Sequence, residues 1–134
     1  MLRPAAALVW LLASSAGAEA ATLVIRAQGI RSGQGTVYAG VCARSFDEAT
    51  CEYRGRAQAR PGTVEIRIPG VRAGRYAVAV YHDVNGNGTF DRTLFIPNEP
   101  YGFSNDIGRG GVPRVEEGLI TVEEPSTLVV VPVR

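Results

Sequence analysis

Apolar and polar residues alternate with a period of two along most of this chain, and no other feature constrains the fold as strongly. In the segment TVEIRI, Val64, Ile66 and Ile68 fall on one face, and the polar residues between them fall on the other. Successive side chains of a β-strand point to opposite faces, so this pattern predicts a strand with one buried face. Residues 23–27 and 37–41 show the same alternation and are predicted to be strands as well.

Three further segments complete the set of predicted strands. Residues 75–82 are apolar at almost every position, which is typical of a central strand that is buried on both faces. Residues 119–123 and 127–133 alternate again and are separated by the turn-forming segment EPS. Proline cannot donate a hydrogen bond to a neighbouring strand, so Pro132 predicts that the last strand lies at the edge of a sheet.

The spacing of these segments predicts the fold class. Glycine and proline residues separate them, and no window has a helical period. Six to seven short strands in about 110 residues predict an all-β fold, an antiparallel Greek-key β-sandwich of the immunoglobulin-like or transthyretin-like kind. We assign residues 21–134 to one β-sandwich domain, since a chain of this length builds one hydrophobic core and not two.

The first twenty residues have the order of features found in a secretory signal peptide. A short segment with one positive charge, Arg3, precedes the apolar run AAALVWLLA, and Ala18-Glu19-Ala20 fits the small-residue rule for cleavage. The apolar run is too short to span a membrane, so we predict a signal peptide over residues 1–20 and a periplasmic or secreted protein. The alternative is a buried N-terminal helix. No later segment is apolar and long enough for a transmembrane helix.

The charge balance and the two cysteines narrow the function classes. Lys and Arg number 14 and Asp and Glu number 13, so the net charge is +1 and offers no basic surface for nucleic acid. Cys42 and Cys51 are the two cysteines, and in an exported protein this even count predicts a disulfide between them. Closing such a short loop stabilises the fold by about 2.7 kcal/mol in the chain-entropy description.

Two segments lack a strand pattern. Residues 44–60 are polar and are expected to form a loop that the disulfide holds near its base. Residues 83–112 form a longer region without a strand signal, and loops of that length in a compact domain are usually functional or disordered. Disorder is disfavoured because this region contains Phe90, Leu94, Phe95, Ile96, Tyr101 and Phe103, which are too apolar for a solvated chain.

The segment HDVNGNGTFD, residues 82–91, has the spacing of a calcium-binding loop. Asp83, Asn85 and Asn87 alternate and are followed by Gly88, as in the pattern D-x-[DN]-x-[DN]-G. Alternate residues of a tightly curled backbone point inward, so three side-chain oxygens meet at one centre, and calcium accepts about six to eight oxygen ligands. We therefore predict calcium as the cofactor. The predicted ligands are Asp83, Asn85, Asn87, Thr89 through its carbonyl, Asp91 and Glu99.

This loop departs from an EF-hand in two ways. The twelfth loop position, a bidentate glutamate in an EF-hand, is Leu94, and a predicted strand instead of a helix precedes the loop. A further carboxylate must then come from later in the chain, with Glu99 or Asp106 as the candidates. The alternative is a turn without an ion, because Asn-Gly pairs are also the strongest hairpin-turn signal.

Three motifs of this chain occur together in a known family. They are GRYAVAVYHDVNGNGTFD at 74–91, IPNE at 96–99 and YGFSN at 101–105. With them the chain resembles a family of secreted bacterial proteins known only as a domain of unknown function, DUF2141. The resemblance covers essentially the whole predicted domain and implies a small periplasmic or secreted β-sandwich without an established activity. The family commonly has an acidic residue where this chain has Val84, which implies weak rather than tight cation affinity.

An ion in the loop would also account for the apolar residues that follow it. With the chain anchored at the ion, residues 94–105 can fold across one end of the sandwich, where Phe95, Tyr101 and Phe103 either line a shallow pocket or plug the open end of the core. The pocket interpretation predicts a small ligand, a glycan or an envelope protein as the partner. The candidate ligand-binding residues are His82, Phe95, Tyr101, Phe103, Ser104 and Asn105.

The sequence gives little support for catalysis. His82 is the single histidine, and a hydrolytic set could be drawn from it with Ser104 and Asp106, but no nucleophile elbow is present. A zinc site would need a second histidine or a free cysteine. We therefore predict a non-catalytic binding protein, with a hydrolase or a purely structural envelope domain as the alternatives.

Overall fold

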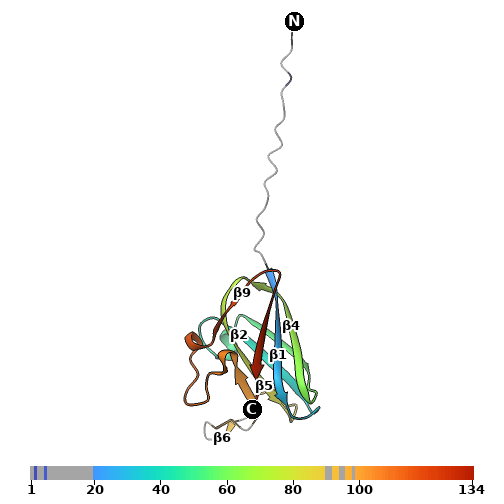
Figure 1. The fold of residues 1–134 in the computed structure, drawn as a ribbon, viewed down its shortest axis with the longest axis vertical. Coiled ribbons are helices and arrows are strands. Elements are labelled where there is room, and N and C mark those ends of the chain that lie inside the picture. The colour runs from blue at the N-terminus through green and yellow to red at the C-terminus, as the bar shows by residue number, and fades with distance from the viewer. Residues whose placement is uncertain (1, 3–4, 6–19, 90–91, 94–95, 98) are drawn as a thin grey trace.

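Two β-sheets pack face to face in the computed structural model, which describes residues 2, 5, 20–89, 92–93, 96–97 and 99–134 (Figure 1). The first sheet has the strand order β10-β1-β4, with bounds β1 Ala20–Ile30, β4 Gly62–Arg72 and β10 Ser126–Pro132. The second has the order β3-β2-β5-β8, with β9 also pairing with β5. Its bounds are β2 Thr36–Cys42, β3 Tyr53–Gln58, β5 Gly74–Asp83, β8 Tyr101–Phe103 and β9 Leu119–Val122.

This arrangement confirms the predicted all-β sandwich. The strand pairs are antiparallel apart from β1 and β10, which run parallel. Short elements fill the connections: β6 Arg92–Thr93 and β7 Ile96–Pro97 pair with each other, and the 3₁₀ helices are η1 Glu48–Thr50, η2 Ser104–Asp106 and η3 Val115–Glu117. The Greek-key connectivity stays a prediction.

The period-two alternation correctly predicts which residues of β4 face the core. Val64, Ile66 and Ile68 of β4 are buried while the residues between them are exposed, and they pack against Leu23 and Ile25 of β1. Burying apolar surface stabilises the fold by about 25 cal/mol for each Å² removed from water, so the two inward faces supply most of the folding free energy. β5 lies inside its sheet, as its apolar sequence predicts, and β10 lies at a sheet edge, as Pro132 predicts.

One predicted loop contains a strand. Residues 44–60 were expected to be loop throughout, but β3 occupies Tyr53–Gln58 and pairs with β2. The strand lies at an edge, so its outward positions are polar, and one inward position is a glycine. A Cβ at Gly55 would lie 2.9 Å from the Ile66 side chain and 2.8 Å from that of Ile68. The packing of β4 therefore excludes the apolar side chain that would have revealed β3.

The prediction that residues 83–112 contain no strand is also wrong, because β8 lies within them and closes one side of the sandwich. The Tyr101 N–H donates to the Arg134 carbonyl, and the Arg134 N–H donates to the Tyr101 carbonyl, both at 3.0 Å. Next to this pair, a Cβ on Gly102 would lie 1.8 Å from the Pro132 carbonyl oxygen. Glycine therefore lets β8 pair with β5 and, at the same time, contact the end of the first sheet.

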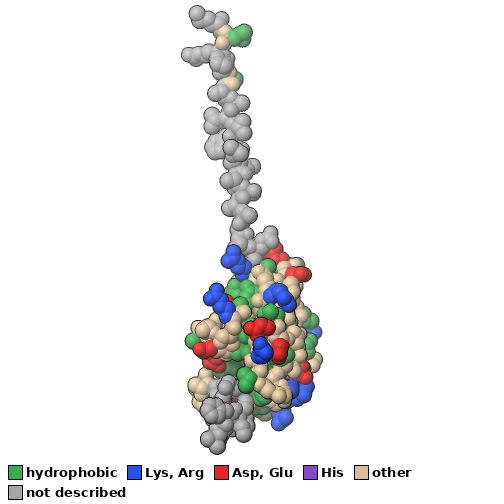
Figure 2. Space-filling model, turned by 90° about the vertical axis from the view of Figure 1, so that its left-hand side faces the viewer, with side chains coloured by type: hydrophobic (Ala, Val, Ile, Leu, Met, Phe, Trp, Pro, Cys, Tyr) green, Lys and Arg blue, Asp and Glu red, His purple; other side chains and the backbone are tan. Residues whose placement is uncertain are grey.

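Most of the predicted signal peptide, residues 1, 3–4 and 6–19, lies outside the described residues. In the described parts of the chain, no helix has the length and apolar character needed to cross a membrane. On the face shown in Figure 2, arginine and acidic side chains are interspersed, in keeping with the net charge of +1.

Candidate functional site

The carboxylate of Asp83 holds the loop that follows β5. Asp83 is the last residue of this strand and is fully buried, with 0% of its surface exposed. Its Oδ1 accepts a hydrogen bond of 3.1 Å from the Gly86 N–H, and its Oδ2 accepts one of 2.7 Å from the Gly88 N–H. Both glycines have positive φ, 72° and 78°, which the tight curl of the backbone requires.

The next two predicted ligands repeat this arrangement. Asn85 Oδ1 accepts from the Asn87 N–H at 3.2 Å, and Asn87 Oδ1 accepts from the Thr89 N–H at 3.0 Å. The side-chain oxygens of three alternate residues are thus turned back onto the loop's own backbone. This is the curled backbone that the spacing predicts, but the same hydrogen bonds also hold the loop without an ion.

A second carboxylate reaches the same segment. Glu99 is 7% exposed, and its Oε2 accepts a hydrogen bond of 2.8 Å from the N–H of Val84, the residue after Asp83. The other candidate, Asp106, instead forms ion pairs with Arg109 at 3.2 Å and with Arg134 at 2.7 Å. Asp91 lies outside the described residues.

The donor set near Asp83 is therefore small. Among residues 20–89, 92–93, 96–97 and 99–134, no group of three or more histidine, cysteine, aspartate and glutamate side chains is arranged to hold a metal. An ion here would take two carboxylates, two amide oxygens and backbone carbonyls, which is a hard-oxygen set of the kind that suits calcium. The calcium site stays a prediction.

A cavity of about 430 Å³ lies on the outer face of the second sheet, next to this loop. Two small residues that pair across β2 and β5, Gly40 and Ala79, form its floor. Ala79 pairs in turn with Phe103 of β8. The cavity exists because these two positions carry little or no side chain, while the neighbouring positions on the same face carry large ones.

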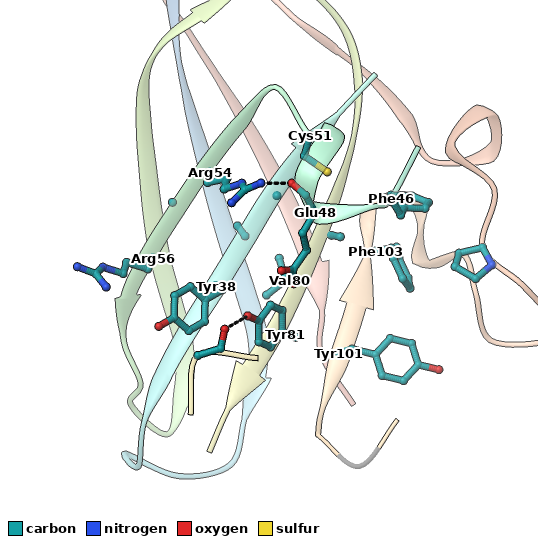
Figure 3. A pocket seen from close by; sticks show the side chains of 16 residues that line it. Tyr38, Phe46, Glu48, Cys51, Arg54, Arg56, Val80, Tyr81, Tyr101 and Phe103 are labelled. Atoms are coloured by element: carbon teal, nitrogen blue, oxygen red, sulfur yellow. Dashed lines mark hydrogen bonds between the residues drawn. The ribbon is translucent and has the colours of Figure 1, made fainter. Parts of the chain in front are cut away.

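Aromatic side chains wall this cavity on two sides (Figure 3). On one side Tyr38 and Tyr81 stack with ring centroids 5.3 Å apart and an interplanar angle of 23°. On the other side Phe103 contacts Phe46 at 4.7 Å and Tyr101 at 5.8 Å, centroid to centroid. Tyr38, Tyr81 and Tyr101 are consecutive partners across β2, β5 and β8, so the sheet register fixes both walls.

Charged groups lie at the remaining edge of the cavity. Glu48 and the two β3 residues Arg54 and Arg56 line it, and an Arg54 N–H donates to the Glu48 carbonyl oxygen. Figure 3 shows the Glu48 side chain directed toward Tyr81. Burial raises the pKa of the Tyr81 hydroxyl above its ordinary value, and the negative charges of Glu48 and Asp83 raise it further.

The predicted disulfide is confirmed and forms part of this cavity. Cys42 and Cys51 are bonded, with their Cα atoms 4.2 Å apart, and Cys51 is one of the lining residues. The bond closes the loop that carries Phe46 and Glu48 and holds it beside the end of β2. The cavity wall that comes from this loop is therefore fixed covalently to the sheet.

A protein family described as "Uncharacterized protein conserved in bacteria (DUF2141)" matches residues 25–129. The chain belongs to this family. The match runs from β1 into β10 and so includes both sheets, the Asp83 loop and the cavity. No curated protein and no solved structure matches the chain. The family description assigns no activity to the DUF2141 domain.

Within this DUF2141 domain, the structure separates the predicted ligand-binding residues into two groups. Tyr101 and Phe103 line the cavity and lie on the outer face of the sheet, so the prediction that they plug the core is wrong for both. Phe95 lies outside the described residues. The other three do not line the cavity: His82, Ser104 and Asn105.

Ser104 and Asn105 instead hold the segment that precedes β9. The Ser104 hydroxyl is fully buried, accepts from the Val78 N–H at 2.9 Å and donates to the Gly118 carbonyl at 2.5 Å. The Asn105 amide donates to the carbonyls of Glu117 and Leu119, both at 3.2 Å. These bonds give both residues a structural role.

His82 faces the core and not the cavity. It is 1% exposed, and its Nε2 lies 2.6 Å from the Gln34 carbonyl oxygen, which only accepts, so Nε2 carries the proton. Within the described residues its Nδ1 has no hydrogen-bond partner. This hydrogen bond attaches the turn that precedes β2 to strand β5. The prediction that the protein is not an enzyme stays a prediction.

Sequence reasoning missed most of the cavity, because most of its lining comes from strands and from the disulfide-closed loop, outside residues 83–112. Tyr38 and Tyr81 each occupy an outward position of a strand, where a solvent-exposed face normally carries short polar residues. The period-two pattern of the sequence could have revealed these large outward-facing residues. It could not reveal that Tyr38 and Tyr81 pair, because their pairing depends on the register of β2 against β5. The missed lining residues with large side chains are Tyr38, Phe46, Glu48, Arg54, Arg56 and Tyr81.

Proposed function

We propose that this DUF2141 domain is an exported, non-catalytic binding protein in which a calcium ion at the Asp83 loop stabilises one wall of the ligand cavity. The observation that carries this proposal is that the loop and the cavity share residues. Gly88 belongs to the Asp83 loop and also lines the cavity. The Tyr81 hydroxyl, in the cavity wall, donates to the Gly88 carbonyl at 3.5 Å.

Glu99 supplies a second connection between the two. Its carboxylate is bonded to the Val84 N–H in the loop, and Glu99 lies two residues before Tyr101, where β8 begins. The His82 N–H also donates to the Pro100 carbonyl at 2.9 Å. An ion that fixes Asp83 and Glu99 therefore also fixes the backbone that leads into β8, from which Tyr101 and Phe103 project.

The oxygen donors near Asp83 support a calcium ion at this point. Asp83 and Glu99 are both buried, and their carboxylates accept hydrogen bonds from backbone N–H groups of residues 84–88. Carboxylate, amide and carbonyl oxygens are hard donors of the kind that calcium prefers.

Export is supported by the predicted signal peptide and by the disulfide. Structural disulfides persist in oxidising compartments such as the periplasm and are rare in the cytosol. A hydrolytic role has no comparable support, because His82 and Ser104 are almost completely buried and their hydroxyl and Nε2 groups bond to the backbone.

The test follows amide resonances of ¹⁵N-labelled protein during a calcium titration. The protein is expressed with its own first twenty residues and recovered from the periplasm, and N-terminal sequencing is expected to begin at Ala21. Calcium should shift the amides of residues 84–89 together with those of Tyr101 and Phe103, but not those of β4. Shifts confined to unrelated acidic residues, or no shifts, would contradict the proposed function.

A further inference from the structure

The cavity has the shape of a slot between aromatic walls. Tyr81 stands on one side and Tyr101 and Phe103 on the other (Figure 3). The small residue Ala79, which pairs with Phe103, lines the floor. A slot of this kind accepts a flat ring whose two faces are apolar, because aromatic faces pack well against C–H groups. Its volume of about 430 Å³ is in the lower part of the range for small-molecule sites.

The open edge of the slot offers both kinds of hydrogen-bonding group. The Glu48 carboxylate only accepts, and the guanidinium groups of Arg54 and Arg56 only donate. The bond from Arg54 to the Glu48 carbonyl orients this guanidinium in the free protein. Hydroxyl groups on a sugar ring each donate and accept, so one ring can donate to the Glu48 carboxylate and accept from an arginine at the same edge.

The same groups disfavour other ligands. The two arginines at the edge disfavour an organic cation, and Glu48 disfavours a phosphate or another strongly anionic group that would lie directly beside its carboxylate. An acyl chain would need a long apolar tunnel, whereas this slot is short and has charged residues at its edge. A ligand without net charge, with apolar faces and a hydroxylated rim, meets all of these conditions.

We propose that the slot between Tyr81 and Tyr101–Phe103 binds a short neutral saccharide, with one sugar ring between the aromatic walls and its hydroxyls bonded to Glu48 and Arg54. This inference rests on the proposed function of the domain as a binding protein. It adds the chemical class of the ligand.

The test uses the calcium-loaded protein and three neutral disaccharides: cellobiose, maltose and N,N′-diacetylchitobiose. Each is titrated to about 10 mM, about ten times a weak Kd of about 1 mM, while the amides of Gly40, Ala79 and Phe103 are followed. Digalacturonate, hexanoate and inorganic phosphate are titrated in parallel as acidic-sugar, apolar and anionic probes. At least one neutral disaccharide should shift the three amides and bind more tightly than all three comparison probes.

Two variants connect the binding to the slot. Ala79→Leu fills the floor from an outward position and should raise the Kd at least about tenfold, because the ring can no longer enter. Thr63→Leu adds the same side chain to an exposed position of β4 and should leave the Kd unchanged. If Ala79→Leu does not fold, Phe46→Ala in the disulfide-closed loop replaces it, with an expected severalfold rise in Kd.

Three outcomes would overturn the inference. They are no shift at the three amides with any neutral disaccharide, equal binding by the slot variant and wild type, and preferential binding of hexanoate, phosphate or digalacturonate. A calcium titration on the same samples distinguishes failure of the saccharide assignment from failure of the proposed function. A protein that responds to calcium but binds none of the sugars retains the proposed function and loses the saccharide assignment.

Discussion

Replacing the buried Gly102 of β8 with alanine should strongly destabilise the fold. The added Cβ would lie 1.8 Å from the Pro132 carbonyl oxygen and 2.9 Å from its carbon, so β8 must move away from the end of β10. That movement breaks the two backbone hydrogen bonds between Tyr101 and Arg134. Two such bonds contribute about 2 kcal/mol, and forced overpacking costs about 1–3 kcal/mol more.

We therefore expect Gly102→Ala to lower the free energy of unfolding by about 3–5 kcal/mol, measured by urea denaturation followed by circular dichroism. For a domain of this size the melting temperature should fall by about 12–20 °C. Gly110→Ala is the matched control, because a Cβ at Gly110 meets no atom within 4 Å, and it should stay within about 0.5 kcal/mol of wild type. If Gly102→Ala is as stable as this control, β8 does not approach β10 as described.

Three further predictions address the loop, the disulfide and Tyr81 in the cavity wall. Asp83→Ala, measured in chelator, should cost about 2–4 kcal/mol because its fully buried carboxylate accepts two backbone hydrogen bonds; stability equal to wild type would refute this role. Replacing Cys42 and Cys51 with serine should cost about 2–3 kcal/mol by urea denaturation, and an unchanged midpoint would show that the short loop is ordered without the bond. The pKa of Tyr81 is raised, so the unfolded state loses this proton first, and stability should fall as the pH rises above about 10. Tyr81→Phe should reduce that loss in urea denaturation at alkaline pH, and an identical pH dependence in the variant would contradict the assignment.

The parts of the fold that follow from local pattern were predictable. Val64, Ile66 and Ile68 fix the inward face of β4 through their spacing alone, and the apolar run of β5 identifies an interior strand. Pro132 identifies β10 as an edge strand. Each of these inferences uses a property that one segment carries by itself, so no knowledge of its neighbours is required.

The parts that depend on pairing were not predictable in this way. β3 and β8 each carry a glycine, Gly55 and Gly102, at the point where another strand comes too close for a side chain. In the sequence alone, a glycine that tertiary packing requires cannot be distinguished from a glycine in a turn. The cavity is hidden for the same reason, since Tyr38 and Tyr81 are far apart in the chain and become one wall through the register of two strands.

The candidate site was therefore predicted in part. The curled loop at Asp83 and the approach of Glu99 agree with the spacing argument, and Tyr101 and Phe103 do line a cavity. His82, Ser104 and Asn105 belong to the sequence motifs, but strand and turn geometry directs their side chains away from the cavity.

The most direct test of the account is the melting temperature of the purified protein in about 10 mM calcium, about 10 mM magnesium and chelator. A Kd of about 0.1–1 mM, the range of weak extracellular sites, gives about 1.4–2.7 kcal/mol of stabilisation. We predict that calcium raises the melting temperature by about 6–11 °C and that magnesium raises it by less. Asp83→Asn should abolish the calcium shift. Asp47→Asn, which changes an exposed aspartate, is the control and should keep the shift. An equal midpoint in calcium and chelator, or an equal calcium shift in Asp83→Asn and wild type, would contradict the account.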